Sequence, residues 1–462
     1  MKVLKFGGTS VGTVASLTNV KKIVEGLDTP AVVVVSALGG ITDMLIATAR
    51  MAAEGCETDY KESFKKIVAR HTQVIDGMTE GETREQVAAD ATAILNELER
   101  LYYGIYLVND LSERVLDRVV SFGERLSSTI ISRIIKGITL VDSRTFIKTV
   151  RRHGKNVLDN EATHGLVQEL LAPLRDGLVL VPGFISTDSD GRITNLGRGG
   201  SDYTAAIIAA ELDADVLDIW TDVDGFLTAD PRRIAGTRII DRMTFVEAME
   251  LCNFGAKVIY PPTIYPVFHK NIPIYIKNTF NYEAPGTRID DGKTIENRGN
   301  VRGVSSLRDT SLVSIERPAD TALRNQLHSR VYNALARKGI DTILSDLSTD
   351  IDTFSFAVSG RDAETVIEEL ELEFGPEIGK QVLRCPQCIS NLATIALVEE
   401  NMPSTQQVLD KARALLANNG IKVVAHSCGK SSSSVGIIVN GTDETAALQA
   451  LHDLFFKNDG NE

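Results

Sequence analysis

Apolar residues recur along this chain with two spacings, and the spacings predict where strands and helices lie. Residues 2–6, 31–35 and 178–181 are short runs dominated by apolar residues, as expected of buried strands. Through most of 51–135 the apolar positions recur every three or four residues, as at Leu95, Leu98 and Tyr102, which predicts helices. Strands that alternate with helices predict an α/β fold with a mostly parallel central sheet and helices on both faces.

The alternation returns between residues 138 and 300. Apolar runs at 216–219 and 272–276 are expected strands, and a glycine-rich loop at 183–200 precedes an expected helix that starts at residue 202. We therefore place one large domain at residues 1–298.

The remaining residues contain an internal repeat. Gly339-Ile340 recurs as Gly420-Ile421, and Gly360 recurs as Gly441 at the same distance along the chain. Each copy follows the order strand, helix, strand, strand, helix, which predicts two α+β ferredoxin-like domains at 304–385 and 390–462, with strand exchange between the copies as one arrangement. Such units pair through their edges. A plain dimerisation module and a sensor with a ligand between the copies both remain open.

Composition narrows the class of protein. Hydrophobic residues make up 43% of the 462 residues, yet the longest apolar runs are far too short to span a bilayer. The formal net charge of −13 argues against general nucleic-acid binding. Because Met1 leads directly into an expected strand, we expect no targeting segment and a cytoplasmic protein, with neither nucleic acid nor membrane as partner.

The cysteines allow one metal hypothesis. The chain has five cysteines, and an odd number favours reduced thiols. Cys385, Cys388, His426 and Cys428 together have the residue types of a zinc site. The spacing is unusual for zinc, so ordinary thiols are the favoured interpretation, and no protein metal site is predicted.

Two glycine-rich stretches have the residue types of anion sites. In Lys5-Phe-Gly-Gly8 a strand leads into a glycine pair, and Thr9 or Ser10 is expected to cap the next helix. Such a turn presents backbone N–H groups to a phosphate, although many similar turns bind nothing.

The second stretch runs from Leu196 to Asp202 and carries Arg198 among its glycines, with Ser201 or Asp202 as the expected helix cap. Arginine can hold a carboxylate through two parallel hydrogen bonds. Trp220-Thr-Asp222 follows another expected strand, which is typical of a nucleotide site at the carboxyl edge of a parallel sheet.

Six motifs together resemble aspartate kinase, a family with the amino-acid-kinase fold. They are Lys5-Phe-Gly-Gly-Thr-Ser, Val35-Ser-Ala37, Ser121-Phe-Gly-Glu-Arg125, Leu196-Gly-Arg-Gly-Gly-Ser-Asp202, Trp220-Thr-Asp-Val-Asp-Gly225 and Phe254-Gly-Ala-Lys257. The repeat resembles that family's pair of ACT regulatory domains. Ile276-Lys-Asn-Thr-Phe-Asn281 further resembles the kinase part of bifunctional aspartate kinase–homoserine dehydrogenase, and we expect no dehydrogenase part here.

The resemblance implies that the chain transfers the γ-phosphoryl group of ATP, with Mg²⁺, to the side chain of L-aspartate. The implied catalytic residues are Lys5, Asp202 and Lys257. The implied ATP-binding residues are Lys5, Phe6, Gly7, Gly8, Ser36, Thr221, Asp222, Leu227, Arg232, Lys257 and Val258. The implied aspartate-binding residues are Thr42, Glu124, Arg198, Gly199, Gly200 and Ser201, with Arg198 on the α-carboxylate and Glu124 on the ammonium.

The same resemblance implies feedback by lysine or threonine, through Asp341, Thr342 and Ser348, and a homodimer or tetramer formed through the ACT domains. Two residues depart from the family pattern. Leu227 stands where a tyrosine is common, and Tyr260 replaces a histidine, so both bear on ATP affinity.

Two other functions stay open at this point. One is an amino-acid sensor with an inactive kinase half, and the other is a kinase of the same fold that acts on acetylglutamate or UMP. The complete set of Lys5, Glu124, Arg198, Asp202 and Lys257 favours aspartate kinase over both.

Overall fold

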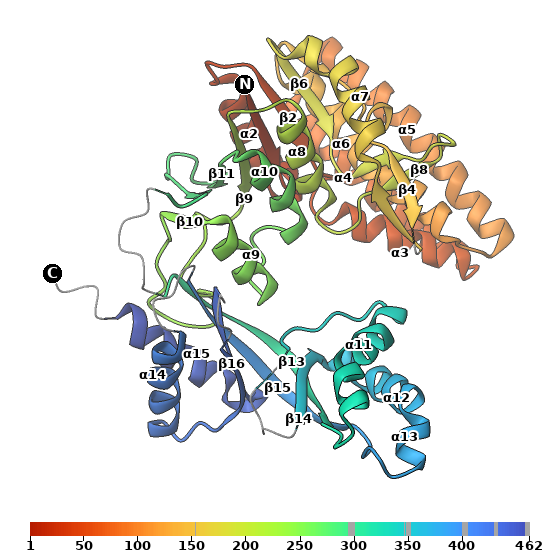
Figure 1. Cartoon of the computed structure of the whole chain (residues 1–462). Coiled ribbons are helices and arrows are strands. Elements are labelled where there is room, and N and C mark those ends of the chain that lie inside the picture. Colours follow the sequence, from red (N-terminus) through yellow and green to blue (C-terminus); the bar gives the residue numbers. More distant parts are fainter. Residues whose placement is uncertain are drawn as a thin grey trace. The chain divides into compact units, whose positions relative to one another are not determined.

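The chain folds into two compact units. The computed structural model describes residues 1–152, 154–293, 301–345, 347, 353–399, 405–428 (the side chain of Cys428 excepted) and 433–457. The first unit contains Met1–Phe226 and Val258–Asp291, and the second contains Leu227–Lys257 and Gly292–Glu462 (Figure 1). Residues 227–257 therefore group with the C-terminal part of the chain, although the sequence places them inside one domain at 1–298.

The first unit is built on a mostly parallel sheet with the strand order β12-β11-β9-β1-β2-β6-β3. The predicted α/β fold is confirmed, because β1 pairs in parallel with both β2 and β9, and only β12 of these strands pairs antiparallel. The bounds are β1 (Lys2–Phe6), β2 (Ala31–Val35), β3 (Ile138–Leu140), β6 (Leu178–Pro182), β9 (Val216–Thr221), β11 (Ile274–Asn278) and β12 (Thr287–Asp290).

Helices α2 to α6 pack their apolar stripes into one core with the side chains of Leu4, Phe6, Val33 and Val35 from the sheet. The apolar residues that recur every three or four positions in 51–135 are those that face this core, so the helices predicted there are confirmed. The helices of the unit are α1 (Gly8–Val11), α2 (Val14–Glu25), α3 (Ile41–Ala53), α4 (Glu57–Met78), α5 (Gly81–Val108), α6 (Glu113–Ile134), α7 (Asn160–Leu170), α8 (Gly200–Glu211) and α10 (Ile264–Lys270). Two small ribbons pair β4 (Thr149–Arg152) with β5 (Lys155–Leu158) and β7 (Ile185–Thr187) with β8 (Ile193–Asn195).

Both predicted helix caps are wrong. Thr9 and Ser10 lie inside α1, which is a single turn, and α2 is capped by Thr13, whose hydroxyl accepts from the backbone N–H of Ser16. The cap of α8 is Gly199, with no side-chain hydrogen bond, so Ser201 and Asp202 lie in the first turn of that helix. Their side chains are thereby left for other contacts.

The second unit contains a five-stranded sheet with the order β14-β13-β15-β17-β16. The strands are β13 (Gly303–Glu316), β14 (Thr353–Ser359), β15 (Gln387–Val398), β16 (Val423–Cys428) and β17 (Ser434–Asn440), and β10 (Arg242–Thr244) also belongs to this unit. The helices are α9 (Phe245–Asn253), α11 (Thr321–Arg337), α12 (Ala363–Glu373), α13 (Gly375–Gly379), α14 (Thr405–Asn418) and α15 (Glu444–Phe456).

The two repeats join through β13 and β15, which pair antiparallel at the centre of this sheet. The second copy follows the predicted order through β15, α14, β16, β17 and α15. In the first copy, the described residues between α11 and β14 contribute a single bridge from Leu344 to Ala357 rather than the predicted strand.

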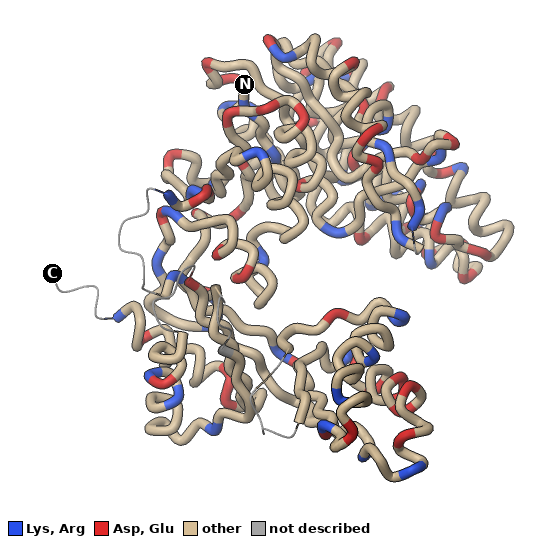
Figure 2. Tube along the Cα trace, in the orientation of Figure 1, with Lys and Arg blue, Asp and Glu red and all other residues tan. Residues whose placement is uncertain are grey.

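Charged residues of both signs are interspersed along the trace of each unit (Figure 2). Among the described helices, none combines the length and the apolar run that crossing a bilayer requires.

The segment 227–257 is held in the second unit by a buried ionic cluster. Glu444, at the start of α15, is 2% exposed and forms ion pairs with Arg233 and Arg308. Ser306 donates to Glu444 Oε1 at 2.7 Å and accepts from Arg233 at 2.7 Å. Burial opposes ionisation of Glu444, but the hydrogen bonds from Arg233, Ser306 and Arg308 outweigh it and lower its pKa. Ala229 and Ile234 add apolar contacts to the core beside α15.

Glu444→Gln is therefore expected to loosen the 227–257 segment, because it leaves Arg233, with a side chain 18% exposed, without its carboxylate. We expect a loss of about 3 kcal/mol in the free energy of unfolding, as is typical when one partner of a buried ion pair is removed. Urea unfolding measures the loss, and hydrogen exchange of amides 228–238 localises it. Asp443→Asn, one residue earlier and not buried, is the matched control; equal effects from the two variants would contradict the assignment.

Candidate active site

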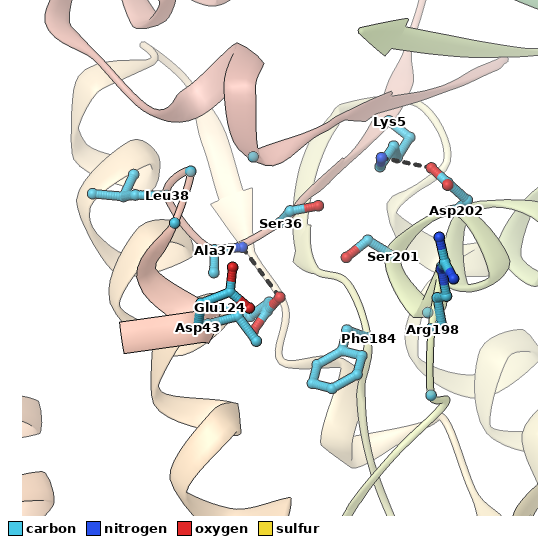
Figure 3. A pocket seen from close by; sticks show the side chains of 17 residues that line it. Lys5, Ser36, Ala37, Leu38, Asp43, Glu124, Phe184, Arg198, Ser201 and Asp202 are labelled. Carbon is cyan, nitrogen blue, oxygen red and sulfur yellow. Dashed lines mark hydrogen bonds and ion pairs between the residues drawn. The ribbon is translucent and has the colours of Figure 1, made fainter. Parts of the chain in front are cut away.

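A cavity of about 360 Å³ opens in the first unit, where β1 and β2 end and α8 begins (Figure 3). Its walls come from segments far apart in the sequence. The residues predicted for catalysis or binding that line it are Lys5, Gly8, Ser36, Thr42, Glu124, Arg198, Gly199, Gly200, Ser201 and Asp202. The cavity therefore brings together the phosphate and aspartate residues that the sequence had placed on separate motifs.

Lys5 and Asp202 form the ion pair at one wall of this cavity. Lys5 Nζ lies 2.6 Å from Asp202 Oδ1, and the two side chains are 12% and 13% exposed. The pair joins the end of β1 to the first turn of α8. Since an ion pair with little solvent around it is weakly screened, Asp202 fixes where the Lys5 ammonium sits.

Glu124, on α6, faces this wall from the other side of the cavity and is 4% exposed. Its Oε1 accepts from the backbone N–H of Ala37 at 3.1 Å, while Oε2 is buried and has no hydrogen-bond partner among the described residues. Burial raises the pKa of Glu124 to about 8, although the bond from Ala37 and the charge of Lys5 act in the opposite direction. A buried acceptor without a partner is costly, and a ligand that donates to it would remove that cost.

Two glycine contacts shape the cavity walls. A Cβ at Gly8 would lie 3.1 Å from the carbonyl oxygen of Ala37 and 3.4 Å from the Cα of Gly39, so the two loops approach too closely for a larger residue. Gly199 has φ of +70°, and a Cβ there would lie 2.3 Å from the Cβ of Tyr260. Tyr260, which departs from the family pattern, thus packs against the backbone of the arginine loop.

Arg198 supplies the positive charge at the mouth of the cavity. It is exposed and forms no ion pair with any described residue. In Figure 3, Arg198, Ser201 and Asp202 lie opposite Glu124 and Asp43. A zwitterion fits this arrangement, with its ammonium at Glu124 and its carboxylate at Arg198.

The other predicted ATP residues lie elsewhere. Phe6 is fully buried and stacks on Trp220, and the Gly7 N–H donates to the carbonyl oxygen of Trp220 at 3.2 Å, so that N–H is not bare as predicted. Thr221, Asp222 and Val258 belong to the first unit but do not line the cavity.

Leu227, Arg232 and Lys257 belong to the second unit, and their roles stay predictions. Leu227 forms a single bridge with Ile239, and Lys257 is exposed. Arg232 pairs with Asp230 through two bonds of 2.9 Å.

The predicted site residues did not include four side chains of the cavity, those of Ala37, Leu38, Asp43 and Phe184. Asp43 lies in the first turn of α3, and the preceding Gly39-Gly40 pair was the available signal. Phe184 gave no signal, because its role depends on a backbone φ of +67° that only the fold reveals.

The regulatory and metal hypotheses gain no geometric support. Asp341 is exposed and Thr342 is partly buried, and Ser348 lies outside the described residues. Cys385 and Cys388 are exposed free thiols, His426 lies on β16, and the Cys428 side chain is outside the described residues. Within the described residues, no group of three or more His, Cys, Asp or Glu could hold a metal ion.

Known proteins resemble this chain over nearly its whole length. Residues 1–278 match the amino acid kinase family. The chain is 32% identical to the bifunctional aspartokinase/homoserine dehydrogenase of Haemophilus influenzae, covering 99% of this chain but only 57% of that relative. It is 31% identical to lysine-sensitive aspartokinase 3 of Escherichia coli, covering 98% and 99% of the two chains. The crystal structure of E. coli aspartokinase III with aspartate and ADP superposes with a TM-score of 0.82 at 29% identity, covering 99% of this chain and 100% of that one.

Glu124 is expected to make stability depend on pH. Since its pKa is raised from 4.5 to about 8, the folded protein keeps a proton that the unfolded chain releases. The contribution of Glu124 to the free energy of unfolding should therefore fall as pH rises from 4.5 to about 8 and then level off. Urea unfolding of the wild type and of Glu124→Gln across this range measures the difference. Glu113→Gln, at an exposed position of α6, is the control; a difference between wild type and Glu124→Gln that does not vary with pH would contradict the raised pKa.

Proposed function

The chain belongs to the amino acid kinase family, and from that premise we propose that it is an aspartate kinase, which phosphorylates the side-chain carboxylate of L-aspartate with ATP. The observation that carries the proposal is one cavity with the Lys5–Asp202 pair on one wall and the unpartnered Glu124 Oε2 on another. The chain spans 57% of the length of its bifunctional relative, so the proposal concerns the kinase activity alone.

The cavity would hold aspartate by its two α-substituents. Arg198 grips the α-carboxylate, and Glu124 receives the ammonium. Because Glu124 is largely protonated below about pH 8 without ligand, binding the ammonium drives a proton off this carboxyl. An acetylated amine carries no positive charge and could not pair with the ionised Glu124. The Glu124 site would therefore select a free amino acid over acetylglutamate.

Aspartate then presents its side-chain carboxylate towards Lys5. A carboxylate with a pKa near 4 is already ionised at neutral pH, so no general base is needed. The difficulty is the repulsion between this anion and the phosphates, about 4 kcal/mol for two unit charges 4 Å apart at an effective dielectric constant of 20. Lys5 offsets part of that repulsion, and Asp202 keeps its ammonium at the cavity wall.

ATP with Mg²⁺ would supply the phosphoryl group and further positive charge. We propose that Lys5, Gly8 and Ser36 contact the phosphates, since they line the cavity beside the Gly8–Gly39 approach. The amide of Gly7 is already used by Trp220, so its part is to fix the turn.

An inactive sensor is less well supported than the enzyme. The orphan Oε2 of Glu124 costs stability unless a ligand donates a hydrogen bond to it. A side chain kept only for folding would be expected to have both carboxylate oxygens bonded.

A hydroxamate assay with ATP tests the reaction and its substrate. We expect product with aspartate and none with acetylglutamate. The aspartate KM should fall as pH rises to about 8. Glu124→Gln should raise the aspartate KM by about 10- to 100-fold, more than it raises the ATP KM. The same variant should also flatten the pH dependence of the aspartate KM. Activity on acetylglutamate alone, or a variant that mainly changes the ATP KM, would overturn the assignment.

Lys5→Ala should lower kcat by about 10²- to 10³-fold, because it removes the charge that faces the transferring group. Circular dichroism and urea unfolding check that the fold survives with Asp202 unpaired. Lys22→Ala, on the exposed side of α2, is the matched control. A well-folded Lys5→Ala protein with nearly normal kcat would remove Lys5 from the mechanism.

We also propose that an amino acid regulates the enzyme through the repeats of the second unit, since one full-length relative is a lysine-sensitive aspartokinase. Lysine and threonine added to the same assay identify the effector. Deleting residues 304–462 is a poor test of the site, because β13 and α15 hold the 227–257 segment. Asp341→Ala and Thr342→Ala are better probes.

A further inference from the structure

A second hollow, of about 590 Å³, lies in the first unit, and none of the residues that line it lines the catalytic cavity. Asp218 on β9 pairs in register with Leu4 on β1 and with Tyr275 on β11, so these three side chains share one face. Lys5 follows Leu4 along β1 and therefore points to the other face. Since the hollow and the cavity that contains Lys5 also share no lining residue, the two are separate.

The floor of the hollow holds a buried acceptor. Asp218 is 3% exposed; its Oδ2 lies 3.0 Å from Lys277 Nζ, and its Oδ1 has no hydrogen-bond partner among the described residues. Lys277 also lies over the Tyr275 ring, 5.1 Å from its centroid, and over the Trp220 ring, 5.4 Å from its centroid. Lys277 is therefore held in place, and the open oxygen calls for a further donor.

The rim supplies positive charge. Arg288 is paired with Asp290 at 2.7 Å and donates to the Tyr275 hydroxyl at 3.1 Å, which leaves part of its guanidinium to face the hollow. Lys2 forms no ion pair with any described residue. A ligand that satisfies both features must combine a hydrogen-bond donor with an anion.

The remaining wall is the loop 279–286, whose conformation is fixed by its own hydrogen bonds. Its turn is closed by bonds from the Phe280 N–H to Asn278 Oδ1 at 2.8 Å and from the Ala284 N–H to the Asn281 carbonyl at 3.1 Å. Gly286 has φ of +74°, and a Cβ there would lie 2.1 Å from the carbonyl oxygen of Ile276, so the loop is pressed onto β11. The loop places Tyr282 and Pro285 beside the hollow as apolar contacts.

We propose that this hollow binds a free α-amino acid. Its ammonium donates to Asp218 Oδ1, its carboxylate faces Lys2 and Arg288, and its side chain packs on Tyr282. Among the charged residues that line the hollow, Asp215 pairs with the Met1 ammonium, Asp218 with Lys277 and Arg288 with Asp290. A zwitterion supplies a donor for the open Asp218 Oδ1 and a carboxylate for Lys2 and Arg288. The inference does not depend on the kinase activity and concerns residues that the catalytic cavity does not share.

Trp220 provides the readout, because it is the only tryptophan of the chain and its ring lies under Lys277. The full-length protein is titrated with L-leucine, L-methionine and L-lysine while tryptophan fluorescence is followed. Hydrogen exchange of amides 279–286 localises the binding. We expect at least one of the three to change the fluorescence and protect this loop. If none of the three amino acids protects the amides of the loop or of β11, the proposal is overturned.

Variants and analogues test the chemistry of the site. Lys2→Gln should weaken binding by roughly threefold, as for an exposed ion pair, and Tyr282→Ala by a similar factor. Asp218→Asn should abolish binding. Because this variant leaves Lys277 without its partner, it could misfold. Lys2→Gln and Tyr282→Ala then still test the proposal. Removing either the amine or the carboxylate of the bound amino acid should cost about tenfold in affinity. Lys61→Gln, on α4, is the control; binding that ignores both Lys2→Gln and Tyr282→Ala overturns the proposal.

Discussion

The ion pair between Lys5 and Asp202 is the contact on which the candidate active site depends. It holds the end of β1 to the first turn of α8, with both side chains largely removed from solvent. Asp202 lies in the first turn of α8 and not at its cap, so its side chain is available to the lysine. The cap is Gly199, where a φ of +70° and the close approach of Tyr260 favour glycine. The cavity then forms between this pair and α6, where Glu124 brings a carboxyl into a place that disfavours its charge.

Glu124 illustrates how burial favours the neutral form of a carboxyl, and in the proposed function the bound ammonium would favour the charged form. Burial outweighs the nearby positive charge of Lys5 and raises the pKa of Glu124, and the ammonium of the proposed substrate would displace the proton. A carboxyl in water would bind an ammonium weakly because both are well hydrated. The same group in a cavity has lost its water beforehand, and this desolvation would give the proposed site its preference for a free amine.

Much of the first unit could be predicted from the sequence, because the strands at 31–35 and 178–181 are apolar on both faces and the helices keep a regular spacing. The site residues came from motifs in order, and the fold gathered ten of them at one cavity. The failures have physical causes. The cap of α8 was misplaced because Asp202 pairs with a lysine distant in sequence, and the cap of α2 because the single turn α1 comes before it. Phe184 depends on a backbone conformation that its neighbours do not signal. The residue types of Ala229 and Ile234 do not indicate which of the two cores they join. The grouping of 227–257 with the second unit could therefore not be predicted from the sequence.

That grouping has a consequence for how this chain can be divided or exchanged. The backbone passes between the units at three places, after Phe226, after Lys257 and after Asp291. Cutting the chain at one place therefore does not give two complete units. If two copies of the protein exchanged their second units, all three connecting segments would have to exchange together. Fragments made by cutting at one linker are therefore expected to lack part of a core, whereas a cut-and-rejoin strategy that keeps 227–257 with the C-terminal half preserves both cores.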